Sequence, residues 1–566
     1  MRSTLMTLHD PQLAKEFYSK GLWQDVTLYG MAVQHAASHP ERFAIRDSEL
    51  RLTWAELVSW ADALATDLHE AGLQSGDRVA GWLPSRVECV VLLLACSRNG
   101  YVSMQALHQN HTVDEIYTLL ERCDVRAFVG QPGYGADADR KDIFSRLHSL
   151  KGFCQAYVVA PPGTSNLNLP PEAKRFPQNR GVKDSPVPDG NPDKIVYIAF
   201  TSGTTGQPKA LMHSDNTLLA NGRALAADWG LTRETVIYCL GPLSHHIATV
   251  GLEQCLITGC EFIVNDQVKG KQPIDRMIES GADYVMGVPT HAIDILQDVR
   301  SRGLEQLGRV KMFYMAGAAI PEEVARQLVA LGVMPQNIYG MSENGSHNAT
   351  IPTDSVETLT RTVGQPVGRG NPAYEVKIWK ADNRDIEAAI GEVGEIGGRG
   401  ATLMLGYFGN HVSTQTSFNR HGWFMSGDLG RLDANGNLEI VGRSKDLIIR
   451  GGHNIYPAEI ENLALRHPGV AKAAAFPVAD ARLGEKVCLA IIPAVGTAPL
   501  SEEILQHLDA VGLSRFDMPE YFLSVEAFPM TASGKILKRE LSEQVKDGHL
   551  KPAAVRWVGT SEATSA

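Results

Sequence analysis

The residue types best suited to phosphate chemistry are gathered in one stretch, Thr201-Ser202-Gly203-Thr204-Thr205-Gly206-Gln207-Pro208-Lys209. Hydroxyl groups, backbone N–H groups freed by glycine and one lysine can all bind phosphate oxygens. The spacing differs from that of a Walker A loop, G-x-x-x-x-G-K-[ST]. A polar surface loop has a similar composition, so a phosphate site requires partners elsewhere in the chain.

Two carboxylates and a lysine could be those partners. Glu343 follows Tyr339-Gly340-Met341-Ser342, and a carboxylate beside phosphates is repelled unless a cation such as Mg²⁺ lies between them. Asp428 follows a glycine in an expected loop, where it could accept hydrogen bonds from the vicinal hydroxyls of a ribose. An aspartate there is also a common turn former. Lys535, in a glycine loop, could equally be a solvated surface residue.

The elements around the phosphate stretch are readable from the pattern. Residues 195–200 form an apolar, β-rich run, and residues 210–212 form a second short strand. Ser214 is placed to cap a helix that runs from about Asp215 to Gly230. The expected order is therefore strand, loop, strand and helix.

The preceding residues indicate an α/β unit. Thr53-Trp54-Ala55-Glu56 has the spacing of a capping box, and leucines and Trp60 recur at helical period as far as about Ala71. A strand at 77–82 and a buried helix at 88–97 follow. This alternation continues to about Val159 and predicts a parallel sheet flanked by helices.

A second, smaller unit follows the strand expected at 438–441. It has a hairpin around Gly451-Gly452, a helix opened by Pro457, and strands at 470–476 and 487–492. We therefore expect two domains: a large N-terminal domain, residues 1–444, of layered sheets flanked by helices, and a small α+β C-terminal domain, residues 445–566. The boundary is placed at Lys445.

Composition limits the class of protein. The 566 residues are 44% apolar and 21% charged, which is ordinary for a globular protein of more than one domain. A net charge of −11 argues against nucleic acid or an anionic membrane as the main partner. Eight scattered cysteines without a CxxC pair, no signal peptide and no apolar run long enough to span a bilayer predict a cytoplasmic protein.

Taken together, these motifs resemble the adenylate-forming superfamily, which includes acyl-CoA synthetases, stand-alone adenylation enzymes and luciferases. The phosphate stretch, Tyr339-Gly340-Met341-Ser342-Glu343, Gly427-Asp428, Gly442-Arg443 and Pro529 to Lys535 occur in the family's order, and the resemblance spans about residues 52–539. It implies formation of an acyl-AMP from a carboxylate and ATP–Mg²⁺, with release of pyrophosphate.

The resemblance also implies roles for individual residues. Lys535 would be the catalytic cation that bridges both reactants, with Glu343 and Thr204 at the metal and His245 at the carboxylate. The ATP site would comprise Thr201, Ser202, Gly203, Thr204, Thr205, Gly206, Lys209, Ala318, Ala319, Tyr339, Gly340, Met341, Ser342, Asp428 and Arg443. The acyl pocket would comprise His245, His246, Ala316, Gly317 and Gly345. For the histidine and the small-residue turn, a buried structural histidine and a tight turn are the competing interpretations.

The second half-reaction would use the small domain. The resemblance implies rotation about Lys445, withdrawal of Lys535, and delivery of Gly451-Gly452 to a channel through which a thiol attacks the acyl-AMP. We expect coenzyme A as the thiol, and the chain is most similar in appearance to bacterial cyclohexanecarboxylate-type CoA ligases. The small residues and the two histidines predict a short, wide pocket for a compact cyclic acid, alicyclic or aromatic.

Two alternatives remain. An aryl-acid adenylating enzyme that loads a carrier-protein thiol has a similar opening, at residues 21–28, but such enzymes have Asn where this chain has His246. A non-catalytic nucleotide sensor on the same fold could lose Lys535 or Glu343, and both are present. The pattern around Lys535 also resembles one that protein acyltransferases recognise, so such an enzyme and its deacylase are further expected partners, as is a second copy in a homodimer.

Overall fold

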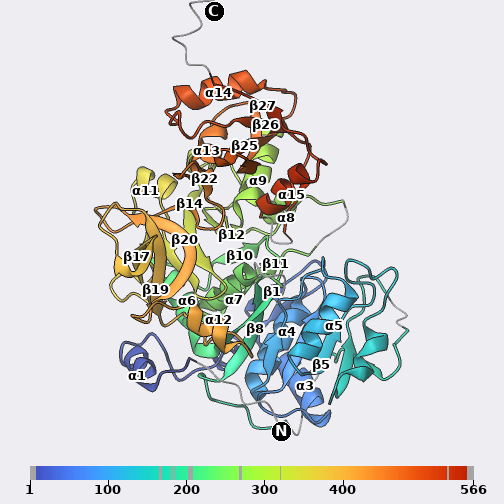
Figure 1. Cartoon of the computed structure of the whole chain (residues 1–566). Coiled ribbons are helices and arrows are strands. Elements are labelled where there is room, and N and C mark those ends of the chain that lie inside the picture. Colours follow the sequence, from blue (N-terminus) through green and yellow to red (C-terminus); the bar gives the residue numbers. More distant parts are fainter. Residues whose placement is uncertain are drawn as a thin grey trace, which may run out of the picture.

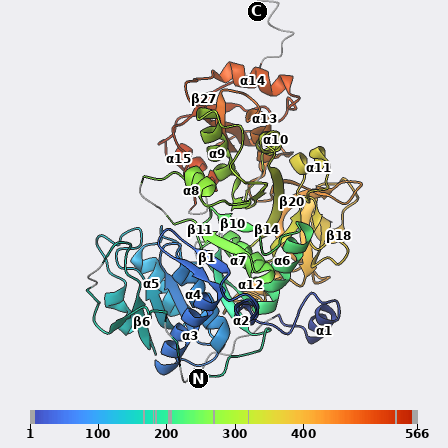
Figure 2. The same cartoon turned by 180° about the vertical axis from the view of Figure 1, so that it is seen from behind.

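The computed structural model describes residues 8–164, 168–179, 181–182, 185–201, 208–266, 270–318, 320–531 and 535–557. The expected mixed α/β fold is confirmed, with a large body of sheets and helices and a small C-terminal unit at one end (Figure 1). The same small unit, with α13–α15 and β22–β27, stands at that end when the molecule is seen from behind (Figure 2). Among the described residues, no helix combines the length and apolar character needed to cross a bilayer.

Two large sheets form the body. In spatial order, the strands of the first are β16 (Gln365–Pro366), β15 (Gly345–Ala349), β14 (Met334–Met341), β13 (Met312–Met315), β12 (Tyr284–Gly287), β10 (Val236–Cys239), β11 (Glu261–Val264), β1 (Phe43–Arg46) and β2 (Arg51–Thr53). Those of the second are β7 (Ala173–Arg175), β6 (Gln155–Val158), β5 (Val125–Gly130), β3 (Arg78–Trp82), β4 (Val102–Met104), β8 (Ile195–Thr201) and β9 (Lys209–Ser214). From β14 to β11 and from β7 to β8, described neighbours pair in parallel, as the alternating sequence predicted.

Helices cover these sheets and fill the space between them. They are α2 (Leu28–Ser38), α3 (Trp54–Glu70), α4 (Val87–Asn99), α5 (Val113–Arg122), α6 (Asp215–Asp228), α7 (His246–Thr258), α8 (Pro273–Glu279), α9 (Pro289–Ser301), α10 (Glu322–Ala330) and α11 (Val356–Arg361), with a 3₁₀ turn at Phe144–Ser149. α7 contacts β10, β11 and β12, whereas α6 contacts β8, β9 and β15. Because α6 and α7 also pack on each other, they link the two sheets.

Local sequence signals explain where several helices begin. Thr53 accepts a hydrogen bond from the Glu56 N–H while the Glu56 carboxylate accepts one from the Thr53 N–H, so the predicted capping box of α3 is confirmed. Ser214 caps α6 in the same way through the Thr217 N–H. All residues from Val87 to Arg98 in α4 are buried, as expected for a helix without a polar face.

A third, antiparallel sheet lies beside the first, and short helices flank it. Its strands, in order, are β18 (Asn383–Glu387), β17 (Tyr374–Lys380), β19 (Gly394–Gly400), β20 (Phe424–Leu432) and β21 (Leu438–Arg443), and α12 (His411–Thr416) precedes β20.

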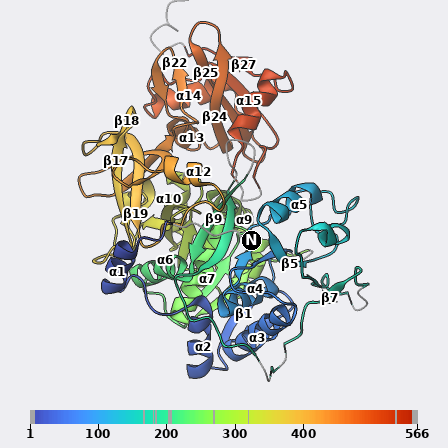
Figure 3. The same ribbon diagram turned by 60° about the horizontal axis from the view of Figure 1, so that its bottom comes forward.

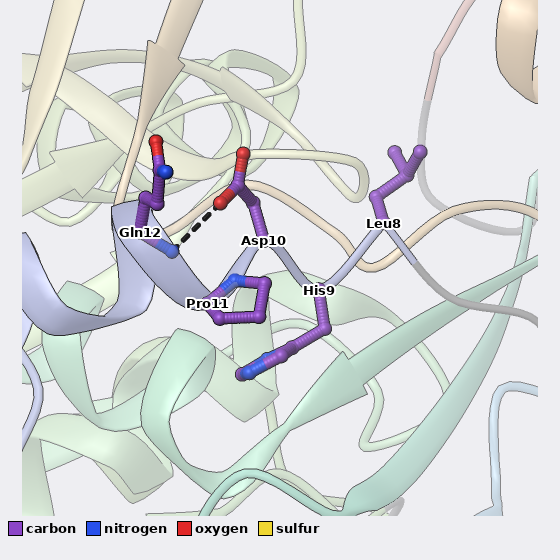
Figure 4. Close-up of a pocket in the computed structure, with 5 residues that line it drawn as sticks. All are labelled: Leu8, His9, Asp10, Pro11 and Gln12. Atoms are coloured by element: carbon purple, nitrogen blue, oxygen red, sulfur yellow. Dashed lines mark hydrogen bonds between the residues drawn. The ribbon is translucent and has the colours of Figure 1, made fainter.

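Near the N-terminus, Asp10 caps α1 (Pro11–Ser19) through the Gln12 N–H. Figure 4 shows this contact in a hollow lined by Leu8 to Gln12, none of which belongs to the candidate site.

The C-terminal unit has a sheet and hydrophobic clusters of its own. Its strands are β22 (Ile448–Arg450), β23 (His453–Ile455), β24 (Val470–Asp480), β25 (Gly484–Pro493), β26 (Tyr521–Ser524) and β27 (Ala553–Ala554), and its helices are α13 (Pro457–Ala464), α14 (Ser501–Ala510) and α15 (Lys538–Lys546). The buried members of both clusters lie between Ile448 and Leu541. Since β21 ends the third sheet at Arg443 and β22 begins the fourth at Ile448, the change of sheet falls on the segment that contains Lys445. Figure 3 shows the unit from a third direction, again at one end.

Candidate active site

The ends of β8 and β9 hold the phosphate stretch between them. These strands are antiparallel, and Thr201 pairs with Lys209 at the point where the connecting loop leaves the sheet. Six residues of this stretch, Ser202 to Gln207, lie outside the described residues, and five of them, Ser202, Gly203, Thr204, Thr205 and Gly206, are predicted ATP-site residues, as is Ala319, which also lies outside. The strands and the capped helix α6 appear as the sequence predicted, and they bring Thr201 and Lys209 side by side.

Glu343 lies in the turn between β14 and β15 and is buried. The Tyr407 hydroxyl donates a hydrogen bond of 3.0 Å to Glu343 Oε1, and Lys209 Nζ lies 4.7 Å from the centre of the Tyr407 ring. Burial raises the pKa of Glu343, and the positive charges of Lys209 and Arg443 oppose that rise. The lysine of the phosphate stretch and the candidate metal ligand are thereby brought to one place through Tyr407, which the sequence analysis missed.

Asp428 was expected in a loop but lies inside strand β20, opposite Arg443 of β21. The preceding glycine, Gly427, has a φ of +76°, which distorts the strand locally and accounts for the turn-like sequence. Asp428 Oδ1 is 2.9 Å from Arg443 Nε, and Tyr339 donates a 2.8 Å hydrogen bond to Oδ2. The predicted trio of Tyr339, Asp428 and Arg443 is therefore in direct contact.

Lys535 reaches this group from the C-terminal unit. Burial and, to a smaller extent, the nearby Arg443 cation lower the pKa of Lys535 to about 8, although Asp428 and Glu343 oppose the shift. A Cβ atom added to Gly317 would lie 3.4 Å from Lys535 Cε. A side chain larger than a methyl group at residue 317 would therefore crowd the lysine, and the φ of +89° at this residue favours glycine.

His245 lies near Lys535 and caps helix α7 through a weak contact of 3.4 Å from the Ile247 N–H to Nδ1. Burial lowers the pKa of His245 to about 3, and the charge of Lys535 contributes to that shift. His108, which the sequence analysis did not single out, has its ring centre 6.3 Å from that of His245 and bonds to Ser244 through Nδ1. The uncharged imidazole can donate a hydrogen bond to a carboxylate that lies beside the lysine.

His245 and His246 stand at the start of helix α7. His246 stacks on His213 at 5.5 Å and on Tyr197 at 6.0 Å, and its buried Nδ1 has no hydrogen-bond partner among the described residues. Two consecutive residues at a helix start diverge by about 100°, so they border different parts of one region. Among residues that the structure describes, no three His, Cys, Asp or Glu side chains gather as a ready-made metal site.

The other predicted residues occupy several places. Gly340 and Gly345 are cross-strand neighbours so close that a Cβ at residue 340 would meet the Gly345 carbonyl oxygen at 1.9 Å. Met341 ends β14, the Ser342 carbonyl oxygen accepts a hydrogen bond from His213, and Ala316 and Ala318 flank Gly317. Gly451 and Gly452 form the exposed turn of the β22–β23 hairpin in the C-terminal unit. The CoA-channel and hinge assignments stay predictions.

This geometry unites a phosphate-loop anchor, a buried carboxylate, an Asp–Arg–Tyr trio and a lysine from a separate unit. Residues 33–408 match the AMP-binding enzyme family, and residues 459–535 match the AMP-binding enzyme C-terminal domain. The chain belongs to this family of enzymes, which confirms the resemblance drawn from the motifs.

Relatives match over nearly their whole length. The chain is 28% identical to a medium-chain fatty-acid–CoA ligase of Escherichia coli, over 94% of this chain and 92% of that protein. It is 29% identical to a salicylyl-CoA synthase/salicylate adenylyltransferase of a Streptomyces species, over 94% and 96%. The structure is similar to that of ATP-bound MatB from Rhodopseudomonas palustris, with a TM-score of 0.78, 26% identity and coverage of 93% and 99%.

Proposed function

We propose that the protein is an AMP-forming carboxylic acid–CoA ligase that acts on compact cyclic acids. The observation that carries this proposal is the position of Lys535 among Glu343, Asp428, Arg443 and His245. Carboxylate and ATP repel each other, and a cation between them removes that repulsion and neutralises charge that builds at the α-phosphorus. Membership of the AMP-binding enzyme family supports the same reaction.

Each side chain then has a distinct task in the first half-reaction. Lys535 and the neutral His245 hold the substrate carboxylate in line with the α-phosphate, while Asp428 accepts hydrogen bonds from ribose hydroxyls. Arg443 fixes Asp428 and adds positive charge. A carboxylate oxygen attacks the α-phosphorus, the bond to the β-phosphate oxygen breaks, and acyl-AMP and pyrophosphate result.

The residues present fit a magnesium ion. Mg²⁺ binds through one or two carboxylates together with phosphate oxygens and water, and Glu343 supplies such a carboxylate beside the loop anchor at Lys209. Thr204 is the other expected ligand and lies outside the described residues. When bound, the ion would neutralise charge on the leaving pyrophosphate.

The second half-reaction needs a thiol that accepts the acyl group. We propose that the C-terminal unit turns about Lys445, so that the thiol of coenzyme A attacks the acyl carbon and AMP leaves. Separate hydrophobic clusters on the two sides of the segment at Lys445 support a domain boundary there, with domains at 1–444 and 445–566. Transfer to a carrier-protein thiol is the second candidate, because one relative's name includes salicylate adenylyltransferase.

One experiment separates these candidates. Pyrophosphate release is measured across benzoate, cyclohexanecarboxylate, octanoate and palmitate, each with and without CoA. We expect the two cyclic acids to give the highest kcat/KM and a CoA thioester. Higher kcat/KM for palmitate would contradict the compact-pocket assignment, acyl-AMP that CoA does not consume would favour a carrier protein, and no release with any acid would support a nucleotide sensor.

A further inference from the structure

Beside the candidate acyl pocket lies a buried carboxyl group that the proposed reaction does not use. Glu253, on α7, is 1% exposed, and within the part of the chain that the structure describes neither carboxyl oxygen has a hydrogen-bond partner. A Cβ added to Gly222 of α6 would meet the Glu253 Cβ at 2.7 Å, so the two helices are tightly packed around it. Burying a carboxyl group without a partner is costly, which calls for an explanation of its presence.

Two other buried carboxylates in the same body have partners for their oxygens. Asp215 accepts hydrogen bonds from Ser97, the Leu28 N–H and Lys194. Asp428 has Arg443 and Tyr339, as described above. Burial raises the pKa of Glu253 well above its usual value, and no cation among the described residues counteracts this. Burial therefore favours the protonated form of Glu253, which has an O–H group to donate.

The surroundings of Glu253 are polar although they are buried. Tyr197 and Tyr314 lie close enough to Glu253 for a charge on its carboxyl group to raise the pKa of both hydroxyls. Burial is the larger cause, and the pKa of Tyr197 is raised to about 12. Thr249 Oγ1 is 3.5 Å from the Tyr197 hydroxyl, and the Tyr314 hydroxyl is 2.7 Å from Ser346 Oγ. We call these five residues the polar cluster: Tyr197, Thr249, Glu253, Tyr314 and Ser346.

Three elements connect the polar cluster to the candidate acyl pocket. On α7, Glu253 lies two turns after His246, about 10 Å along the helix axis, and helical side chains lean back toward the helix start. Tyr314 is two residues before Ala316 in an extended segment, and Ser346 directly follows Gly345. The Tyr197 ring stacks on His246. The cluster thus adjoins the candidate acyl pocket.

We propose that Glu253 determines substrate specificity by binding a neutral oxygen substituent, a hydroxyl or oxo group, on the acyl ring opposite the carboxylate. This inference rests on the proposed function and names its substrate class: compact ring acids that carry a polar group at the far end. The Glu253 O–H donates to the substituent oxygen, and the Tyr197 hydroxyl lies on the same side. A purely hydrocarbon ring would leave the Glu253 carboxyl group without a partner.

The test compares matched acids: cyclohexanecarboxylate, 4-hydroxycyclohexanecarboxylate and 4-oxocyclohexanecarboxylate. In the wild-type protein we expect kcat/KM for the oxygenated acids to exceed that for cyclohexanecarboxylate by about tenfold or more. Glu253→Leu should abolish this preference, whereas Glu253→Gln, which keeps an N–H donor, should retain most of it. The KM for ATP should be unchanged in both variants.

The control variant is Gln254→Leu. Gln254 is equally buried on the same helix but its amide contacts Val250 and Met286, toward the nine-stranded sheet. It should alter kcat/KM for all three acids by a common factor. Thermal melting with each acid provides a readout without turnover, and the oxygenated acids should raise the Tm of the wild type more than cyclohexanecarboxylate does.

The possible failures are distinguishable. If wild type prefers the plain ring acid, or if Glu253→Leu changes all three values equally, the specificity role is wrong even though the ligase activity stands. If 4-aminocyclohexanecarboxylate is preferred, Glu253 acts as an anion and the neutral-oxygen assignment is wrong. Absence of pyrophosphate release with every acid overturns the proposed function itself, and the melting comparison then decides the Glu253 assignment alone.

Discussion

The carboxylates of the candidate active site and the lysine that faces them are held in different ways. Asp428 has two close partners in the large body, and the hydroxyl of Tyr407 orients Glu343. Lys535 instead belongs to a unit with its own hydrophobic clusters. That unit meets the large body through ion pairs that include Arg466–Glu322 at 2.8 Å and Lys472–Asp294 at 3.2 Å.

The two regions therefore differ in how firmly they hold their functional groups. Groups fixed by a buried network keep their geometry through the whole cycle, because rearranging them would break many contacts. Ion pairs that solvent reaches contribute little each, about 0.2–1 kcal/mol, so we expect the unit that carries Lys535 to be displaced at small cost. In the proposed reaction the large body provides the nucleotide and metal sites, and the small unit provides the component that moves.

The largest expected effect comes from Lys535→Ala. Loss of the cation that faces both anions should lower kcat for acyl-AMP formation by about 10²- to 10³-fold. If the C-terminal unit withdraws before the thiol attacks, conversion of supplied acyl-AMP to acyl-CoA should be unaffected. Thioester yield from acid plus ATP is compared with yield from synthetic acyl-AMP. Equal losses in the two assays would mean that Lys535 does not leave the site. Acetylation of Lys535 also removes its charge, so the acetylated protein should behave like the alanine variant.

Glu343→Ala tests the fixed side of the site. Removing the candidate ligand should raise the Mg²⁺ concentration needed for half-maximal pyrophosphate release on the order of 10- to 100-fold, with little change in Tm. Tyr407→Phe is the matched control, since it removes only the hydrogen bond to Glu343 and should have a smaller effect. Unchanged magnesium dependence in Glu343→Ala would remove Glu343 from the metal site.

The pH dependence distinguishes a poised lysine from an ordinary one. Lys535 must be protonated to act, and its pKa is lowered to about 8 by burial and by Arg443. The kcat/KM for the acid should therefore fall as pH rises through about 8, well below the usual value of about 10.4 for lysine. Conversion of supplied acyl-AMP provides the comparison and should lack this limb. A profile that stays flat to pH 10 would contradict the buried position of the lysine.

The smallest effect is expected from the ion pairs between the two regions. Arg466→Ala with Lys472→Ala should lower the rate of acyl-AMP formation by about two- to tenfold, because the position that places Lys535 in the site is less favoured. The thioester step should be unchanged or faster. The control is Lys377→Ala, which removes a surface pair with Glu387 inside the large body. If the double variant behaves like the control, these ion pairs do not set the position of the C-terminal unit.

The sequence predicted the fold better than it predicted the surroundings of Asp428 and Glu253. Periodicity and capping residues located α3, α4, α6 and the β22–β23 hairpin, because each has a local signal. Asp428 was placed in a loop because a glycine precedes it, and only pairing with Arg443, 15 residues later, makes that segment a strand. Glu253 carried no signal, since α7 is buried nearly all round and lacks a polar face.

Gly317 has a consequence for protein engineering. A Cβ atom at residue 317 would lie 3.4 Å from Lys535 Cε, at van der Waals contact, so larger side chains would compete with the lysine for this space. Because the positive φ of Gly317 also disfavours a side chain, a bulky residue such as valine there would obstruct the lysine without altering a charged group. We therefore expect residue 317 to be the place at which to build a ligase that completes a supplied mixed anhydride but cannot make one.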